Sequence, residues 1–447
     1  MFLKIALQNL RQGGRRTWLL GIALAIVSAL LILLLSLSNG INASLVKAAT
    51  AFTTGHVNVS GFFKSSPTAA AAPIVTDMSK VKAIVEKNTP GVRFVIDRHR
   101  GWAKLVSETS SVFAGLIGID AVREKYLFDV LKIAPTSAYM ETGGTDELVG
   151  DVRKLAEPKT CALFAAQAKR LGIRVGDQVT IRTETLRGMS NTTDATVVAV
   201  LEDMGLVNSW SMFVPTKTIL SLYGIQEDST GAIMIYLDDI AKADEVLAHL
   251  RGVLSDAGYP ILDHDPRPFF VKFEVISGQD WDGQQLDLTI WKDEVSFMEW
   301  VLTALDSISF ILVFVLTVII ALGIMNTLWI AVRERTREIG TLRAIGMSRR
   351  GILILFVLEA TLLGILATTI GVAVSGVLAL GLDALGVQIP VAALRNILMS
   401  ETFQFVVVPN QLVLTILGFT FFCALASVLP AMRAARLPPI TAIHQTE

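Results

Sequence analysis

Four stretches of this sequence contain no Asp, Glu, Lys or Arg: residues 17–46, 307–332, 360–382 and 402–432. Each is longer than the roughly 20 apolar residues that a helix needs to cross ~30 Å of hydrocarbon. Charged residues make up only 18% of the chain, against about 25% in an average soluble protein. The sequence therefore predicts an integral membrane protein with four transmembrane helices, which we place at residues 17–46, 307–332, 351–382 and 402–432.

The distribution of charge gives these spans an orientation. Residues 1–16 carry four Lys or Arg and no acid, and residues 333–350 carry six Arg against two Glu. Residues 47–306 instead carry 26 Lys or Arg against 34 Asp or Glu, a net charge of −8. Because basic segments stay in the cytoplasm, we expect both termini, the tail at 433–447 included, to be cytoplasmic. Residues 47–306 and the loop at 383–401 then lie outside.

The chain begins with an amphipathic pattern. Its apolar residues recur at the i, i+3, i+4, i+7 spacing of one helix face: Leu3, Ala6, Leu7 and Leu10. We predict a helix within residues 1–16 that lies at the membrane surface. The apolar run that follows is too long for the h-region of a signal peptide, so we expect it to be a retained anchor.

The exterior segment mixes helix and strand patterns. Residues 55–61 alternate as a strand, and a second strand pattern at residues 232–239 precedes an amphipathic helix within residues 241–260. Between these units, stretches such as ATVVAVLEDMG favour β-structure. The pattern predicts a large α+β domain at residues 47–306, with one part from 47–150 and 231–300 and an inserted β-rich part from 151–230.

Motifs for catalysis and cofactor binding are absent from this sequence. It contains no P-loop, no G-x-G-x-x-G after a strand, no H-E-x-x-H and no G-x-S-x-G. The five histidines lack metal-ligand spacing. Cys161 and Cys423 fall in the exterior segment and the last span, so we expect no disulfide between them. We predict a non-catalytic chain without a cofactor or metal of its own.

Two features of the third span concern helix packing. Four small residues lie four apart on one helix face: Ala367, Gly371, Ser375 and Ala379. Such a stripe allows a second helix to approach closely, either within this chain, which we favour, or from a second copy. Glu359 lies near the cytoplasmic end of the same span, where a buried carboxylate requires a partner. We expect that partner to be a nearby arginine or a cytoplasmic protein.

The segment RERTREIGTLRAIGMSRR at residues 333–350 is too long for a bare turn. Ile339, Leu342, Ile345 and Gly346 approximate one helix face. A loop whose arginines only set topology and contact anionic lipid headgroups would explain the charge. It would not explain the glycines and the apolar residues, which favour a short helix that docks into a groove of another protein.

Residues 333–364 resemble the signature of the FtsX/MacB-type permeases of ABC transporters, R-x-x-E-I-G-x-x-R-A-[IL]-G followed by a Glu in the next span. Eight residues match: Arg335, Glu338, Ile339, Gly340, Arg343, Ala344, Gly346 and Glu359. Three further stretches are similar to parts of this family: IALQNLRQGGRRTWLL, AKRLGIRVGDQVTI and LPAMRAARLPPITAI. Members of this family also share the order of parts seen here: one span, a large exterior domain and three more spans.

The resemblance implies a bacterial inner-membrane subunit whose periplasmic domain has a porter-like part. Such permeases work as dimers, with a second copy or a paralogue, and dock on a cytoplasmic ABC ATPase dimer that binds ATP and Mg²⁺. The spans transmit movement to the periplasmic domain, which is called mechanotransmission. The implied coupling residues are Arg333, Glu334, Arg335, Glu338, Ile339, Gly340, Leu342, Arg343, Ala344, Gly346 and Arg349. Unlike MacB itself, this sequence shows no ATPase domain, so we expect a separate ATPase chain.

Two functions follow from the resemblance. The first is extraction or export of an amphiphilic substrate such as a lipoprotein, as in the LolC/LolE type, with a periplasmic adaptor or lipoprotein carrier as a partner. The stretch LLLSLSNGINASLVKAATAFTTGHVNV resembles that group. The second is transmembrane signalling in the manner of FtsX, which controls a cell-wall hydrolase and transports nothing. Membrane lipids are expected partners in both cases, and nucleic acid in neither.

Overall fold

The computed structural model of the protein describes residues 2–12, 14–69, 71–185, 188–203, 211–296, 299–391, 394–395, 398 and 400–436. The chain divides into two compact units. The membrane unit takes residues 1–43, 301–388 and 402–447, and the head takes residues 44–300 and 389–401. The stretch 389–401, predicted as an exterior loop, is therefore part of the head. Most of the predicted tail at 433–447 lies outside the described residues.

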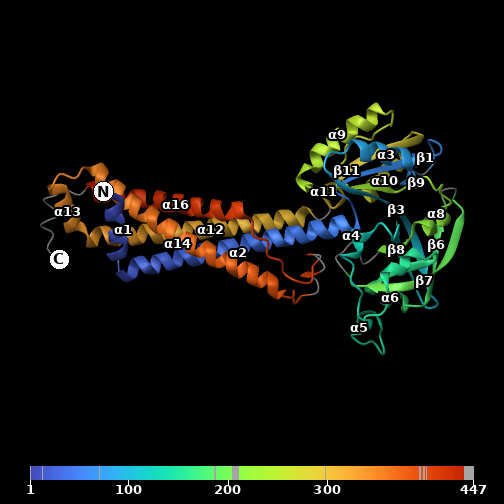
Figure 1. Ribbon diagram of the computed structural model, residues 1–447, viewed down its shortest axis with the longest axis horizontal. Helices are drawn as coiled ribbons and strands as arrows, with labels where there is room; N and C mark the ends of the chain where they lie inside the picture. The colour runs from blue at the N-terminus through green and yellow to red at the C-terminus, as the bar shows by residue number, and fades with distance from the viewer. Residues whose placement is uncertain are drawn as a thin grey trace. The chain divides into compact units, whose positions relative to one another are not determined.

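Long helices build the membrane unit (Figure 1). They are α1 (Phe2–Gln12), α2 (Gly14–Phe52, which ends in the head), α12 (Glu299–Glu334), α13 (Thr336–Ala344), α14 (Arg349–Leu385) and α16 (Pro409–Arg436). Four of them are long and apolar enough to cross a membrane: Thr17–Phe52, Ser307–Glu334, Arg349–Leu385 and Pro409–Arg436. The predicted fold class, four transmembrane helices with a large α+β domain, is confirmed.

The fourth span starts later than predicted. Residues 402–408 are not helical, and the Val406 amide donates to the Ser36 carbonyl at 2.9 Å. The helix begins at Pro409, because proline suits the first helical position, where its missing N–H costs nothing. The absence of charge had marked the stretch as apolar, but hydropathy alone does not distinguish non-helical chain from helix.

The stripe of small residues on α14 packs within this chain. Ala367, Gly371, Ser375 and Ala379 are all buried. A Cβ atom at Gly371 would collide with Ser28 Oγ and the Ala25 carbonyl of α2. The stripe is thus the place where α2 and α14 approach each other, which agrees with the favoured interpretation.

A nine-stranded sheet forms the framework of the head, with the strand order β11-β1-β10-β3-β4-β8-β5-β7-β6. The strands are β1 (Val57–Lys64), β3 (Val92–Val106), β4 (Ser111–Ile119), β5 (Thr160–Phe164), β6 (Gln178–Glu184), β7 (Ser190–Leu201), β8 (Ser211–Pro215), β10 (Ala232–Leu237) and β11 (Gly283–Ile290). Two short strands, β2 (Val75–Thr76) and β9 (Ser229–Thr230), pair separately. The helices are α3 (Met78–Asn88), α4 (Lys125–Phe128), α5 (Thr136–Tyr139), η1 (Val152–Ala156), α6 (Ala165–Leu171), α8 (Thr216–Tyr223), η2 (Ile240–Lys242), α9 (Ala243–Asp256), α10 (Phe269–Ser277) and α11 (Trp291–Glu294).

The first part of the head is an antiparallel sheet of β11, β1, β10 and the first half of β3. Side chains of β10 alternate between two cores, because successive residues of a strand point to opposite faces. Ile233 and Ile235 pack with α3 and α9, whereas Met234 and Tyr236 pack on the other face. Both faces of this sheet are therefore covered.

The second part of the head is a barrel. The second half of β3 pairs with β4 and also with β6, at Lys104–Val106, so the order β3-β4-β8-β5-β7-β6 returns to β3. The division between the two parts thus lies within β3, near His99, and not at residue 150 as the sequence pattern had placed it. A single 15-residue strand serves both sheets, and no turn signal marks the change of partner.

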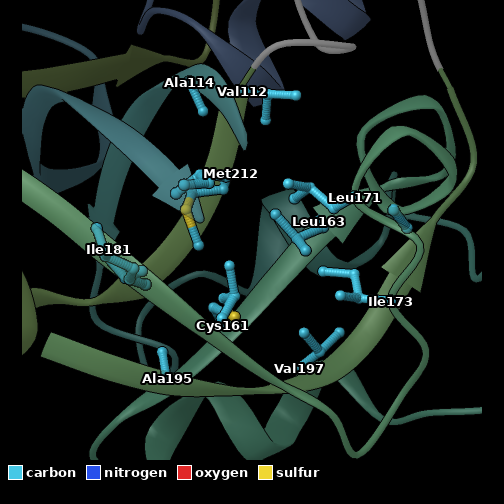
Figure 2. Packing of buried hydrophobic residues seen from close by; sticks show 14 of the residues in the cluster. Val112, Ala114, Cys161, Leu163, Leu171, Ile173, Ile181, Ala195, Val197 and Met212 are labelled. Carbon is cyan, nitrogen blue, oxygen red and sulfur yellow. The ribbon is translucent and has the colours of Figure 1, made fainter. Parts of the chain in front are cut away.

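The barrel interior is filled with apolar side chains. Figure 2 shows Leu163, Ile181, Val197 and Met212 gathered around Cys161. Burial raises the pKa of the Cys161 thiol, so this cysteine is a core residue without thiolate reactivity.

We predict that Gly371→Ala destabilises the protein and that Gly376→Ala on the same helix does not. The new methyl group at position 371 would force α2 away, which costs roughly 1–3 kcal/mol for overpacking, whereas the space at Gly376 is open within 4 Å. Thermal unfolding of the full chain in detergent micelles, followed by circular dichroism, measures the difference. Equal stability of the two variants would contradict the described α2–α14 contact.

Candidate functional site

Residues 333–350, which we call the elbow, consist of a break, a short helix and a second break. α12 ends at Glu334, and Arg335 separates it from α13. After α13, Gly346 adopts a φ of +105°, a left-handed conformation that glycine tolerates best and that commonly ends helices. The Ser348 side chain then accepts a hydrogen bond from the Gly351 amide and caps α14. The short helix predicted within residues 333–350 is thus confined to α13, and the breaks on either side fold the segment into a corner.

Arg335 binds three helices together at the first break. Its Nη1 lies 3.2 Å from Glu359 Oε1 on α14, and its Nη2 lies 3.5 Å from the Asn9 carbonyl of α1. Asn9 Nδ2 donates to Glu359 Oε2 at 3.3 Å. Glu359 therefore has an arginine partner, as its position near the end of the span required. The pair also fixes α1 and α14 to the start of α13.

The inner side of α13 is attached to the same unit. Ile339 and Gly340 are buried, and Ile339 belongs to the apolar core of the membrane unit. Leu342 packs against that core, and Arg343 Nη1 donates to the Ala435 carbonyl of α16 at 3.4 Å. These contacts hold the helix on the ends of the spans.

The outer side of α13 is exposed. Ile345 leaves 80% of its surface accessible. The other exposed residues of the elbow are Arg333, Glu334, Arg337, Glu338, Thr341, Ala344, Gly346, Ser348, Arg349 and Arg350. The single docking face expected from Ile339, Leu342, Ile345 and Gly346 is thus divided. The first two stabilise the corner and only the last two remain accessible.

A second feature, in the head, concerns the end of α2. The Arg98 guanidinium is fully buried and donates from Nη1 to the carbonyls of Ala51 and Phe52, at 2.7 and 3.1 Å. Its Nε and Nη2 bind the two oxygens of Glu124 at 2.5 and 2.7 Å. The last carbonyls of a helix lack partners inside the helix and carry its negative dipole end. One arginine satisfies two of these carbonyls and pairs with a carboxylate.

Two neighbouring side chains complete the arrangement. The Tyr236 hydroxyl donates to the Thr50 carbonyl at 2.6 Å, and Arg100 Nη2 donates to the Thr53 carbonyl at 3.0 Å. Four successive carbonyls at the end of α2 are therefore held by side chains of the head. We call this set the joint: the carbonyls of residues 50–53 with Arg98, Arg100, Glu124 and Tyr236.

The electrostatics of the joint favour the charged form of Arg98. Burial alone would lower the pKa of this guanidinium, but the Glu124 carboxylate raises it above its ordinary value. Burial raises the pKa of the Tyr236 hydroxyl, so that group remains a neutral hydrogen-bond donor.

Sequence analysis did not identify the joint. Arg98 lies in a strand with several other charged residues, and Glu124 lies 26 positions further on. No local spacing links them, because the contact depends on how β3 and the segment before α4 meet the end of α2. The one available signal was the number of charges in β3, which was unusual for a strand buried on both faces.

We predict that Arg98→Met destabilises the head by roughly 3–5 kcal/mol, because it leaves the Glu124 carboxylate buried without a partner. Arg98→Met combined with Glu124→Leu recovers most of this loss. Urea unfolding of the full chain, followed by tryptophan fluorescence, measures both. Arg267→Met, which breaks the exposed pair with Asp265, is the control and has little effect. Equal losses in the single and the double variant would contradict the dominant role of the ion pair.

No group of three His, Cys, Asp or Glu in the described parts of the chain lies close enough to hold a metal ion. Elbow and joint are both structural arrangements of hydrogen bonds and ion pairs. They can transmit force or bind a partner, and neither presents a nucleophile with an adjacent base.

Comparison with known proteins supports this description. A model of the MacB-like periplasmic core domain matches residues 17–253, and a model of the FtsX-like permease C-terminal matches residues 310–439. The macrolide export ATP-binding/permease protein MacB of Nitrobacter winogradskyi is 27% identical over 257 residues, which cover 55% of this chain and 33% of that protein. MacB of Agrobacterium fabrum is 33% identical over 122 residues, 27% of this chain and 17% of the relative. The chain thus spans a third or less of the length of these relatives.

Solved structures give a weaker likeness. The extracellular domain of the noncanonic ABC-type transporter YknZ from Gram-positive bacteria is 13% identical, with a TM-score of 0.30, and the match covers 51% of this chain and 98% of that one. The periplasmic region of MacB from Actinobacillus actinomycetemcomitans is 12% identical, also with a TM-score of 0.30, over 55% of this chain and 92% of that one. Because the MacB-like model alone matches more than half of the residues, the chain belongs to the FtsX/MacB-type permease family.

Proposed function

We propose that this protein is a permease subunit of an ABC transporter that works by mechanotransmission. The exposed side of α13, around Ile345 and Gly346, docks on a cytoplasmic ABC ATPase dimer that binds ATP and Mg²⁺. The observation that carries the proposal is the two-sided elbow. Its inner side is fixed to the spans through Arg335 and Arg343, and its outer side presents an 80% exposed isoleucine.

A helix that serves as a coupling element needs one side fixed to the spans and one side open to a partner. Force applied to α13 reaches the spans only if α13 does not slide over them, and the buried contacts of Ile339 and the Arg335–Glu359 pair oppose sliding. The partner in turn needs an apolar anchor surrounded by charges, which is the usual anatomy of a protein interface. Ile345 supplies the apolar anchor, and Arg337 and Glu338, which are also exposed in the elbow, supply charges.

The joint is the second element of the proposal. α2 is one helix from Gly14 to Phe52, and its final carbonyls are bound by Arg98, Arg100 and Tyr236. Because the bonds from Arg98 and Arg100 are buried and charge-assisted, they are stronger than ordinary hydrogen bonds. A movement of α2 is therefore passed to the head at this point.

The membrane orientation and the substrate complete the proposal. The charge bias favours cytoplasmic termini and elbow, with the head in the periplasm of a bacterial inner membrane. A dimer of two such permeases, identical or paralogous, would extract or export an amphiphilic substrate such as a lipoprotein. A periplasmic adaptor or a lipoprotein carrier would receive that substrate.

We predict that Ile345→Asp weakens binding of the ATPase that co-purifies with the wild-type chain by at least about tenfold, since it places a charge in an apolar interface. Ile345→Val is the matched control and retains binding. Pull-down from membranes and the ATP hydrolysis rate of the complex measure the effect. Leu342→Asp is a poor test because Leu342 packs against this chain's own core. Unchanged association and hydrolysis in Ile345→Asp would contradict docking at the elbow.

A further inference from the structure

A small cavity lies in the head beside the joint. Its volume is about 70 Å³, and a single water needs roughly 10–15 Å³ on this measure, so several non-hydrogen atoms fit. The walls are mostly aromatic and aliphatic: Phe52, Trp102, Leu116, Ile117, Phe269 and Phe270. The cavity is partly open, and Trp102 in its wall leaves 43% of its surface accessible. An apolar group can enter from the open side.

One buried nitrogen in the wall of the cavity lacks a hydrogen-bond partner. Arg100 lines the cavity, and its side chain is only 7% exposed. Its Nη2 is bound to the Thr53 carbonyl, but its Nη1 is buried without a hydrogen bond. The nearest carboxylate oxygen, Glu294 Oε2, is 3.8 Å from Nη1. A buried donor without an acceptor costs free energy, so this position favours a ligand that supplies an oxygen.

The missing group is an acceptor and need not be a counter-charge. Glu294 lies close enough to balance the charge of Arg100 but already accepts hydrogen bonds from Thr289 Oγ1, at 3.0 Å, and from the Phe269 amide, at 3.5 Å. The face of the Phe269 ring covers the guanidinium at 4.3 Å. Burial lowers the pKa of the Arg100 guanidinium. A carbonyl or carboxylate oxygen would supply the missing acceptor.

We infer that this cavity binds the carbonyl end of a fatty-acyl group, as a free fatty acid or an acyl ester. The acyl oxygen accepts from Arg100 Nη1, the first methylenes contact Phe52, Ile117 and Phe269, and the remaining chain leaves past Trp102. Oxygen and hydrocarbon in one ligand match the two demands of the site, a single acceptor and apolar walls.

The inference deepens the proposed function because it names an acyl chain as the part of an amphiphile that the head recognises. Phe52 and Thr53 line the cavity and also belong to the end of α2 that the joint holds. A bound acyl group therefore contacts the element that we propose to move the head. Its test requires no ATPase, so this inference and the proposed function can fail separately.

Photo-crosslinking of the full chain in lipid nanodiscs tests the site. The probes are a long-chain fatty acid and its monoacylglycerol ester, each with a diazirine close to the carbonyl carbon, and peptide mass spectrometry locates the adducts. We expect adducts within residues 98–102, 115–117 or 269–270 with one or both probes, and competition by unlabelled palmitate. A matching alkane diazirine, which has no oxygen acceptor, gives at least about tenfold less labelling there.

Two variants of one strand separate the cavity from general lipid contact. Ile117→Trp fills the cavity and should reduce these adducts about tenfold, whereas Phe113→Ala, on the same outward side of β4 but outside the cavity, should retain them. Labelling of the spans serves as an internal standard and stays constant in both variants. Adducts confined to the spans, or cavity adducts that persist in Ile117→Trp, would overturn the inference. Labelling by the fatty acid alone would assign the site to carboxylates, and labelling by both probes would assign it to acyl carbonyls in general.

Discussion

The buried guanidinium of Arg98 holds the carbonyl end of α2 in place. A lone charge at this depth would be too costly to keep, since its hydration is lost and little replaces it. Glu124 and the carbonyls of Ala51 and Phe52 supply the replacement. Because the arginine and the helix end stabilise each other, neither can move without the other, and the attachment of α2 to the head follows from this one constraint.

The elbow contains a similar arrangement of an arginine, a carboxylate and a backbone carbonyl. Arg335 pairs with Glu359 and also reaches the Asn9 carbonyl, which belongs to the last turns of α1. In both places an arginine joins a carboxylate and a backbone carbonyl, and its planar, multi-donor group makes this possible where lysine could not. The two arrangements differ in burial, with Arg335 21% exposed and Arg98 1% exposed.

The sequence predicted the features that depend on local composition. Charge-free runs identified four spans, and the elbow motif led to Arg335 and Glu359. The sequence could not show that β3 changes partner near His99, because the strand continues without a turn. It also placed Ile339 and Ile345 on one face, although α13 ends at Ala344 and Ile345 already follows the path of the next turn. Contacts between distant segments, such as Arg98 with Glu124, require the fold itself.

The central claim is that a movement started at the elbow reaches the head through the joint. Spin labels at Phe113→Cys, a position 79% exposed on the head, can report it in the reconstituted permease–ATPase dimer, since Cys161 and Cys423 are buried. Pulsed electron resonance then measures the label-to-label distance with and without trapped ATP. The account predicts a distance change in the otherwise native chain, and a much smaller one when Arg98→Met and Glu124→Leu remove the joint while ATP hydrolysis continues. An identical change in both proteins would contradict it.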